Sequence, residues 1–116
     1  IVKSFFERQI EFLSQYGEQQ IILDPGIGFN KSMKSNFELL NNIKDYRVNN
    51  LPVLIGISRK SMIYKTLKTT PQEALNGTTV LNTIALMKGA DILRVHDVKE
   101  AKEAVKITKL INENSR

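Results

Sequence analysis

Three short apolar runs along the chain each end in polar or charged residues. They cover residues 20–24, 52–57 and 91–95, and Ile, Val and Leu dominate them. A short apolar run bounded by turn residues is typical of a strand that is buried on both faces. The pattern therefore predicts three buried strands, each followed by polar side chains.

Around these runs, apolar residues recur at the spacing of amphipathic helices. A first helix is expected over residues 2–16 and is closed by Gly17, which can adopt the left-handed conformation of a helix end. A second helix is expected to begin at a capping box formed by Ser35 and Glu38, and to run to about Tyr46.

Two further helices complete the pattern. Pro71 is suited to the first position of a helix, and the main third helix is expected to follow Gly77 and to run to Gly89. Asp97 is expected to cap the last helix, with Glu100 in the reciprocal position. The apolar residues expected to face the core are Phe5, Phe6, Ile10, Phe12 and Leu13, then Phe37, Leu40 and Ile43, then Val80, Leu81, Ile84, Ala85 and Met87, and finally Val98, Ala101, Val105 and residues 107–111.

The resulting order, α-β-α-β-α-β-α, implies a parallel sheet, because each crossover helix returns the chain to the same end of the sheet. A doubly wound sheet and a β/α barrel both satisfy it. The polar strand ends recur about every 35 residues, close to the roughly 30 residues per unit of an eight-unit barrel, which favours the barrel. That fold needs about 250 residues. We therefore expect this chain of 116 residues, which opens on Ile1, to be part of a longer protein or to complete its sheet with another chain.

The composition excludes several classes of protein. With 41% apolar and 25% charged residues, the chain is typical of a soluble globular domain, and no apolar run approaches the roughly 20 residues that span a bilayer. The absence of cysteine excludes disulfides and thiolate metal sites and fits the cytoplasm. The net charge is +5, but the lysines are scattered over predicted helix surfaces, so nucleic-acid and membrane partners are not expected.

The first strand runs into residues 24–29, Asp-Pro-Gly-Ile-Gly-Phe. Pro25 favours extended backbone at Asp24, which places the carboxylate at the strand tip. Gly26 and Gly28 allow the backbone to approach a flat ligand closely. A carboxylate at this point could accept two N–H bonds from an amino-substituted heterocycle; a tight turn in which Asp24 is a local cap is the alternative.

The second strand runs into residues 58–61, Ser-Arg-Lys-Ser. Two adjacent cations after a buried strand suit an anion, because arginine supplies a planar fork of donors and lysine a compact one. Solvated loop charges are the alternative.

The third strand runs into residues 94–97, Arg-Val-His-Asp. Alternation along the strand sends Arg94 and His96 to the same side, where they suit a phosphate or pyrophosphate leaving group. A partly buried, hydrogen-bonded histidine is the alternative. With one His, no Cys and no clustered carboxylates, a metal site made by this chain alone is not expected.

Together the three segments resemble dihydropteroate synthases. The phrases Asp-Pro-Gly-Ile-Gly-Phe (24–29), Gly-x-Ser-Arg-Lys-Ser (56–61) and Arg-Val-His-Asp-Val (94–98) occur in this order in that family, and Gly-Ala-Asp (89–91) precedes the last strand. The similarity spans nearly the whole chain. It implies that residues 1–116 are the C-terminal part of a pterin-binding TIM barrel, about three of its eight β/α units.

The resemblance implies a transferase of folate biosynthesis, which joins p-aminobenzoate to a dihydropterin pyrophosphate and releases pyrophosphate. In that family Asp24 and Lys60 would hold the pterin above the backbone of Gly56. Arg94 would stack on the pterin and bind the anion together with His96, so Lys60, Arg94 and His96 are the catalytic candidates. The residues that the resemblance assigns to substrate binding are Asp24, Gly28, Phe29, Gly56, Ser58, Arg59, Lys60, Arg94 and His96.

The resemblance also places a p-aminobenzoate site, which sulfonamides occupy too, beside Ser58, Arg59 and Phe29. Two residues depart from the family's pattern near this site. Asn30 stands where glycine is usual, and Met62 where an aromatic or large apolar residue is common. Both are expected to alter the loop geometry there.

The family's magnesium ion is linked to an asparagine of N-terminal units that this chain does not contain. We therefore expect the isolated chain to be inactive and, with open sheet edges, to form a homo-oligomer. Two other functions fit the pattern less closely: a folate-binding methyltransferase barrel, and a non-catalytic half-barrel interaction module.

Overall fold

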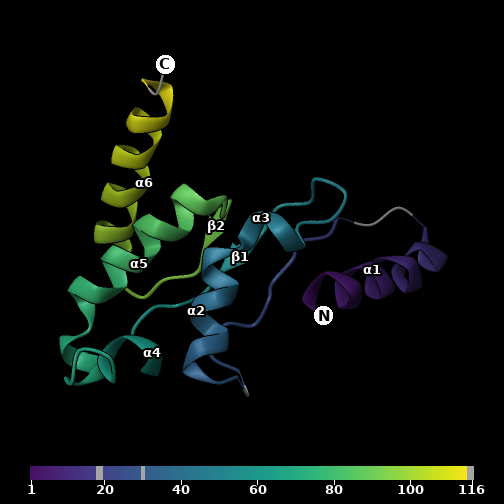
Figure 1. Cartoon of the computed structure of the whole chain (residues 1–116). Helices are drawn as coiled ribbons and strands as arrows, with labels where there is room; N and C mark the ends of the chain where they lie inside the picture. The colour runs from purple at the N-terminus through teal and green to yellow at the C-terminus, as the bar shows by residue number, and fades with distance from the viewer. Residues whose placement is uncertain (18–19, 30, 115–116) are drawn as a thin grey trace.

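A computed structural model describes residues 1–17, 20–29 and 31–114 as a mixed α/β fold with a small parallel sheet (Figure 1). The elements in chain order are α1 (Val2–Leu13), η1 (Ser14–Tyr16), α2 (Met33–Asn41), α3 (Ile43–Tyr46), β1 (Leu54–Ile55), α4 (Ser61–Tyr64), η2 (Pro71–Glu73), α5 (Leu75–Lys88), β2 (Ile92–Leu93) and α6 (Val98–Glu113).

The sheet is parallel, as the alternation of helices and strands predicts, but its strands are short. β1 and β2 pair in a register that sets Leu54 opposite Ile92. The first predicted strand contributes one parallel bridge, between Leu23 and Val53. The three extended segments therefore lie side by side, with β1 in the middle. A residue belongs to a strand only where a neighbour bonds it, so the outer segments show less strand than their apolar runs predict.

The core lies on one face of this sheet. Alternate residues of the middle segment, Val53, Ile55 and Ile57, are each 0% exposed. They join one apolar cluster with Leu40 of α2 and Ile43 of α3, to which α5 also contributes. Because side chains alternate along a strand, helices covering these three residues leave the intervening ones on the opposite face.

The second helix begins earlier than predicted. Ser32 is its N-cap residue, and the Ser32 hydroxyl accepts a 3.1 Å hydrogen bond from the backbone N–H of Ser35. The predicted capping box is therefore wrong, because Ser35 already lies inside α2 and Glu38 pairs with Lys34 at 3.9 Å on the exposed surface. A break after α2 is followed by the short helix α3, which ends at the predicted residue, Tyr46.

The third helix also begins earlier than predicted. α5 starts at Leu75, so Gly77 lies inside it rather than before it, and Pro71 opens only the short helix η2. Packing explains the glycine, because a Cβ at Gly77 would lie 2.5 Å from Cγ2 of Ile63 in α4. Gly89, in the left-handed conformation, ends α5 as predicted.

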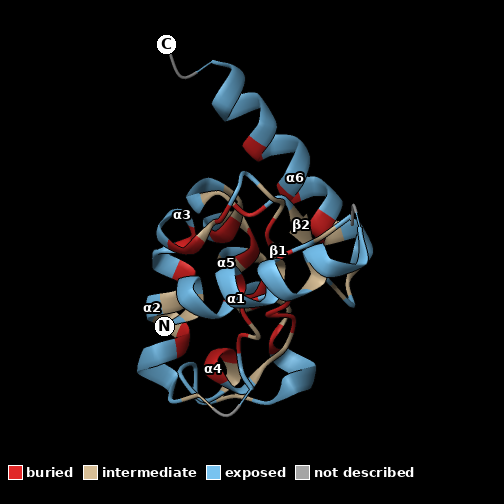
Figure 2. Ribbon diagram, turned by 90° about the vertical axis from the view of Figure 1, so that its right-hand side faces the viewer, coloured by how far each residue is buried: buried red, intermediate tan, exposed pale blue. Residues whose placement is uncertain are grey.

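The last helix packs on α5 through small residues, and its far end projects beyond the rest of the molecule (Figure 2). The residues of α6 that are buried are Ala101, Ala104 and Thr108. Many larger side chains predicted to face the core are exposed instead: Phe5, Phe12, Val80, Ile84, Met87, Val98, Val105, Ile107, Leu110 and Ile111. Their spacing identifies an apolar side of each helix but not what covers it. Across the described ranges, no helix is both long and apolar enough to cross a membrane.

Candidate functional site

The residues singled out at the three strand ends lie on one face of the sheet. Side chains alternate along each extended segment, and the residues between the buried positions point away from the helices. In this way the sheet presents Asp24, Gly56, Ser58, Arg94 and His96 on the face opposite the core. The strands are parallel, so all five also lie at the same end of the sheet.

The register of β1 and β2 continues beyond the strands and brings their ends together. Ser58 and His96 are 38 residues apart, as are the paired residues of the sheet. Oγ of Ser58 lies 2.7 Å from Nδ1 of His96 and accepts a 3.3 Å hydrogen bond from its backbone N–H. Arg94 lies across Gly56, where a Cβ would stand 2.6 Å from Nη2 of the guanidinium. Arg94 and His96 therefore share one side of their segment, as alternation predicts.

Asp24 makes both the local contact and the long-range contact that its position allows. One carboxylate oxygen accepts a 2.9 Å hydrogen bond from the backbone N–H of Gly26, which is the local cap. The other lies 3.3 Å from Nη1 of Arg94, 70 residues away in the chain. Since both side chains are exposed, this ion pair contributes at most about 1 kcal/mol to stability. Its effect is to orient the two groups toward the same space.

Lys60 turns back toward the first strand end. Its ammonium group donates a hydrogen bond to the carbonyl oxygen of Ile27 and lies 4.7 Å from the centre of the Phe29 ring. Partial burial lowers the pKa of Lys60 below its usual value, and the nearby positive charge of Arg94 lowers it further. The lysine is therefore less strongly held in its charged form than an exposed lysine, and an anion placed beside it would restore that charge.

Arg59 turns the other way. Its Nε and Nη2 donate hydrogen bonds of 3.0 and 2.9 Å to the two carboxylate oxygens of Asp97. The carboxylate does not cap α6, so the predicted reciprocal capping with Glu100 is wrong. A two-bond contact with a guanidinium is stronger than a bond to a neutral N–H, which explains the preference. The same contact lowers the pKa of the Asp97 carboxyl group.

Two buried polar residues support these loops and were not singled out from the sequence. The amide oxygen of Asn36 accepts a 2.8 Å hydrogen bond from the backbone N–H of Gly28. The hydroxyl of Thr78 accepts a 3.0 Å hydrogen bond from the backbone N–H of Arg59. Asn36 is 4% exposed and Thr78 is 2% exposed. A polar residue at an inward position of a helix was the only signal, and the sequence does not show which loop it bonds.

This arrangement suits a flat ligand that carries an anionic group. Asp24 offers a carboxylate, Lys60 and Arg94 offer positive charge, and His96 lies beside Ser58. The two predicted cations do not act together, since Lys60 faces this space while Arg59 is turned toward α6. In the described part of the chain, no group of three or more His, Cys, Asp or Glu side chains could hold a metal ion. The donor set is largely cationic and does not fit a magnesium ion held by this chain alone.

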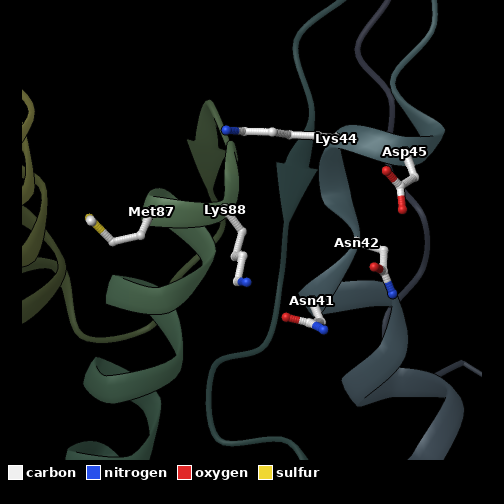
Figure 3. A pocket seen from close by; sticks show the side chains of 6 residues that line it. All are labelled: Asn41, Asn42, Lys44, Asp45, Met87 and Lys88. Carbon is white, nitrogen blue, oxygen red and sulfur yellow. The ribbon is translucent and has the colours of Figure 1, made fainter.

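A separate surface hollow lies at the opposite end of the sheet, between α2–α3 and α5 (Figure 3). It is lined by exposed residues at or near the C-terminal ends of these helices: Asn41, Asn42, Lys44, Asp45, Met87 and Lys88. Lysines near helix C-termini interact favourably with the helix dipole. The two lysines therefore have a structural explanation, and the hollow is not part of the strand-end site.

Comparison with known proteins identifies the family. A family model described as a pterin binding enzyme matches residues 1–96. The chain belongs to the pterin-binding enzyme family. Within that family it is 44% identical to the dihydropteroate synthase of Escherichia coli K12 over 108 residues, which are 91% of this chain and 38% of the relative. The predicted resemblance to dihydropteroate synthases is thereby confirmed.

Solved structures of the pterin-binding family have the same fold. The crystal structure of the dihydropteroate synthase from Yersinia pestis superposes with a TM-score of 0.92 at 38% identity, covering 97% of this chain and 54% of that one. A second structure of the Yersinia pestis enzyme, in complex with a sulfonamide drug, also gives a TM-score of 0.92 and covers 42% of that chain. The chain thus spans about two fifths to one half of the length of these relatives.

Proposed function

We propose that residues 1–116 form the C-terminal three β/α units of a dihydropteroate synthase barrel and provide part of its substrate site. The single observation that carries this proposal is the convergence of Asp24, Lys60 and Arg94 at one end of a parallel sheet. The family match and the 44% identity support it. The reaction is the transfer of a pterin-methyl group to p-aminobenzoate, in a protein that remains assigned to the cytoplasm only by prediction.

In this reaction the bond between the methylene carbon and the pyrophosphate oxygen breaks, and a bond to the amine nitrogen of p-aminobenzoate forms. The nitrogen loses one proton, and pyrophosphate leaves with the bonding electron pair. The chemistry needs positioning and stabilisation of the departing negative charge rather than a strong nucleophile. Arg94 and His96 would bind the anion, while Asp24 and Lys60 would hold the pterin over Gly56.

The amine substrate would lie beside Gly28, Phe29 and Ser58, and a sulfonamide would occupy the same place. The prediction that Arg59 contacts p-aminobenzoate stays a prediction. Met62 is 2% exposed and packs in the core, which supports an effect on the loop from beneath rather than by direct contact. Asn30, the other departure from the family's pattern, lies outside the described residues.

A magnesium ion would supply charge neutralisation on the pyrophosphate when bound. The side chains of this chain do not form a site for it, so each step above is assigned to Asp24, Lys60, Arg94 and His96 alone. Because the chain spans only 38% of its relative, we expect it to bind the pterin weakly and to show no turnover without the remaining units.

Calorimetric titration of the 116-residue chain with a pterin pyrophosphate analogue tests the proposal. Asp24→Asn is expected to weaken binding about tenfold or more, because hydrogen bonds to charged groups contribute about 1.5–3 kcal/mol. Asp45→Asn removes the same charge from the exposed surface of α3 and should leave binding unchanged. If the folded chain binds no analogue, or if both variants bind as the parent chain does, the assigned pterin contacts are wrong.

We also infer that the chain forms a homo-oligomer. The sheet has two open edges among the described residues, and Ile22, on the face away from the core, is 53% exposed. Exposed strand edges and large apolar surfaces favour association. Light scattering should therefore give a mass above that of one chain, rising with concentration. A constant monomer mass at high concentration would contradict this inference.

A further inference from the structure

Arg59 is the most fully engaged side chain near the strand ends, and none of its contacts faces the ligand space. Besides the two bonds to Asp97, Nη1 donates hydrogen bonds of 2.8 and 2.9 Å to the carbonyl oxygens of Pro71 and Gln72. Four of the five N–H donors of a guanidinium are therefore used within the protein. Binding a substrate carboxylate with Arg59 would require these bonds to break.

The backbone of Arg59 is also constrained. Its φ is +53°, in the left-handed region that costs a residue with a Cβ about 1–2 kcal/mol. Its N–H is held by the buried hydroxyl of Thr78. A residue in this conformation reverses the chain direction locally, so its two neighbours can serve the site while its own side chain points to α6. Those neighbours are Ser58, which contacts His96, and Lys60, which reaches Ile27.

We propose that Arg59 is a positioning residue, which clamps the loop after β1 to η2 and to the start of α6 so that Lys60 and Ser58 face the pterin site. The clamp runs parallel to the Ser58–His96 contact, since Arg59 and Asp97 are also 38 residues apart. Together the two contacts fix the ends of β1 and β2 relative to each other. The part of this proposal that concerns ligand rests on the proposed function; the part that concerns Lys60 does not.

The test compares Arg59→Gln, Asp97→Asn and the double variant in the 116-residue chain. A clamp predicts that each single change weakens binding of the pterin pyrophosphate analogue by a similar factor, roughly 10- to 100-fold, and that the double variant is little worse than either. Arg59→Lys keeps the charge but not the fork, so it should not restore binding. A much larger loss in Arg59→Gln than in Asp97→Asn, or rescue by Arg59→Lys, would assign Arg59 to direct ligand contact and overturn the proposal.

A second readout needs no ligand. The charges that act on the pKa of Lys60 are those of Arg94, Asp24 and Lys31, and burial acts most strongly. NMR titration of the Lys60 ammonium group should therefore show a lowered pKa in the parent chain. In Arg59→Gln and in Asp97→Asn that pKa should rise toward the usual lysine value, because the side chain moves into solvent. An unchanged Lys60 titration in both folded variants would overturn the clamp.

Arg47→Gln is the matched control. Arg47 also pairs with a carboxylate, that of Asp91 at 2.9 Å, and also bonds a backbone carbonyl, that of Gly89, but at the other end of the sheet. Its loss should lower stability while leaving the Lys60 titration and ligand binding unchanged. If Arg59→Gln does not fold, Asp97→Asn supplies the same comparison. A parent chain that binds no analogue but shows the shift in Lys60 would refute the proposed function and retain the clamp.

Discussion

Gly56→Ala is expected to weaken binding of a pterin pyrophosphate analogue about tenfold or more, while changing the free energy of unfolding by less than about 1 kcal/mol. The added Cβ would lie 2.6 Å from Nη2 and 3.0 Å from Cζ of Arg94, so the guanidinium must move away. It is the end of a flexible, exposed side chain, and its movement costs little stability. What is lost is the position of a cation that would contact the ligand. Calorimetry and chemical denaturation measure the two effects separately.

Two variants make this result specific. In Arg94→Gln the cation is absent, so adding Gly56→Ala should change binding little further. Gly77→Ala is the same chemical change at a site where the new Cβ meets buried Ile63 at 2.5 Å. Overpacking of that kind typically costs about 1–3 kcal/mol and should leave binding intact in the folded chain. Parent-like affinity in Gly56→Ala would show that the position of Arg94 does not matter to the ligand.

The strand-end cluster follows from the sequence because two general rules suffice to derive it. Parallel strands bring their C-terminal ends to one edge, and alternation selects which side chains share a face. With the apolar runs recognised, Asp24, Gly56 and Arg94 are placed together without knowledge of any contact. The cluster could therefore be predicted even though its strands contain only two residues each by hydrogen bonding.

Contacts that choose between several local partners could not be predicted in this way. Ser32 and Ser35 lie three residues apart, and both precede a helical pattern, so the sequence does not decide which hydroxyl caps α2. Asp97 stands at a helix start in either case, but its carboxylate pairs with an arginine 38 residues away. Local patterns describe what a residue is able to bond, whereas the tertiary structure decides which bond is made.

The apolar sides of the late helices show the same limit in packing. Val98 and Val105 have the spacing of a buried stripe, yet they are 55% and 45% exposed, while the small residues Ala101 and Ala104 make the contact with α5. Spacing predicts that a helix has an apolar side, but the size of its residues determines how closely another helix can approach. The exposed stripe agrees with the inference that further surface is covered on association.

Ile55→Ala is expected to lower the free energy of unfolding by about 2–5 kcal/mol, the usual cost of removing a buried Ile or Leu side chain. Ile55 is 0% exposed in the middle strand and belongs to the single core cluster of this fold. A domain has only about 5–15 kcal/mol of stability in total, so the melting temperature should fall by roughly 10 °C or more. Chemical denaturation at several protein concentrations measures this loss.

Ile22→Ala is the informative comparison, because it removes the same atoms from the opposite face of the sheet, where Ile22 is 53% exposed. In a monomer the change should cost less than about 1 kcal/mol. If two chains cover this face with each other, the cost should approach that of Ile55→Ala and should increase with protein concentration, because association then contributes to stability. A small effect of Ile55→Ala would mean that the face of β1 toward the helices is not the core. The pair of variants therefore tests which face of the sheet the isolated chain buries, and whether it buries the second face only in an assembly.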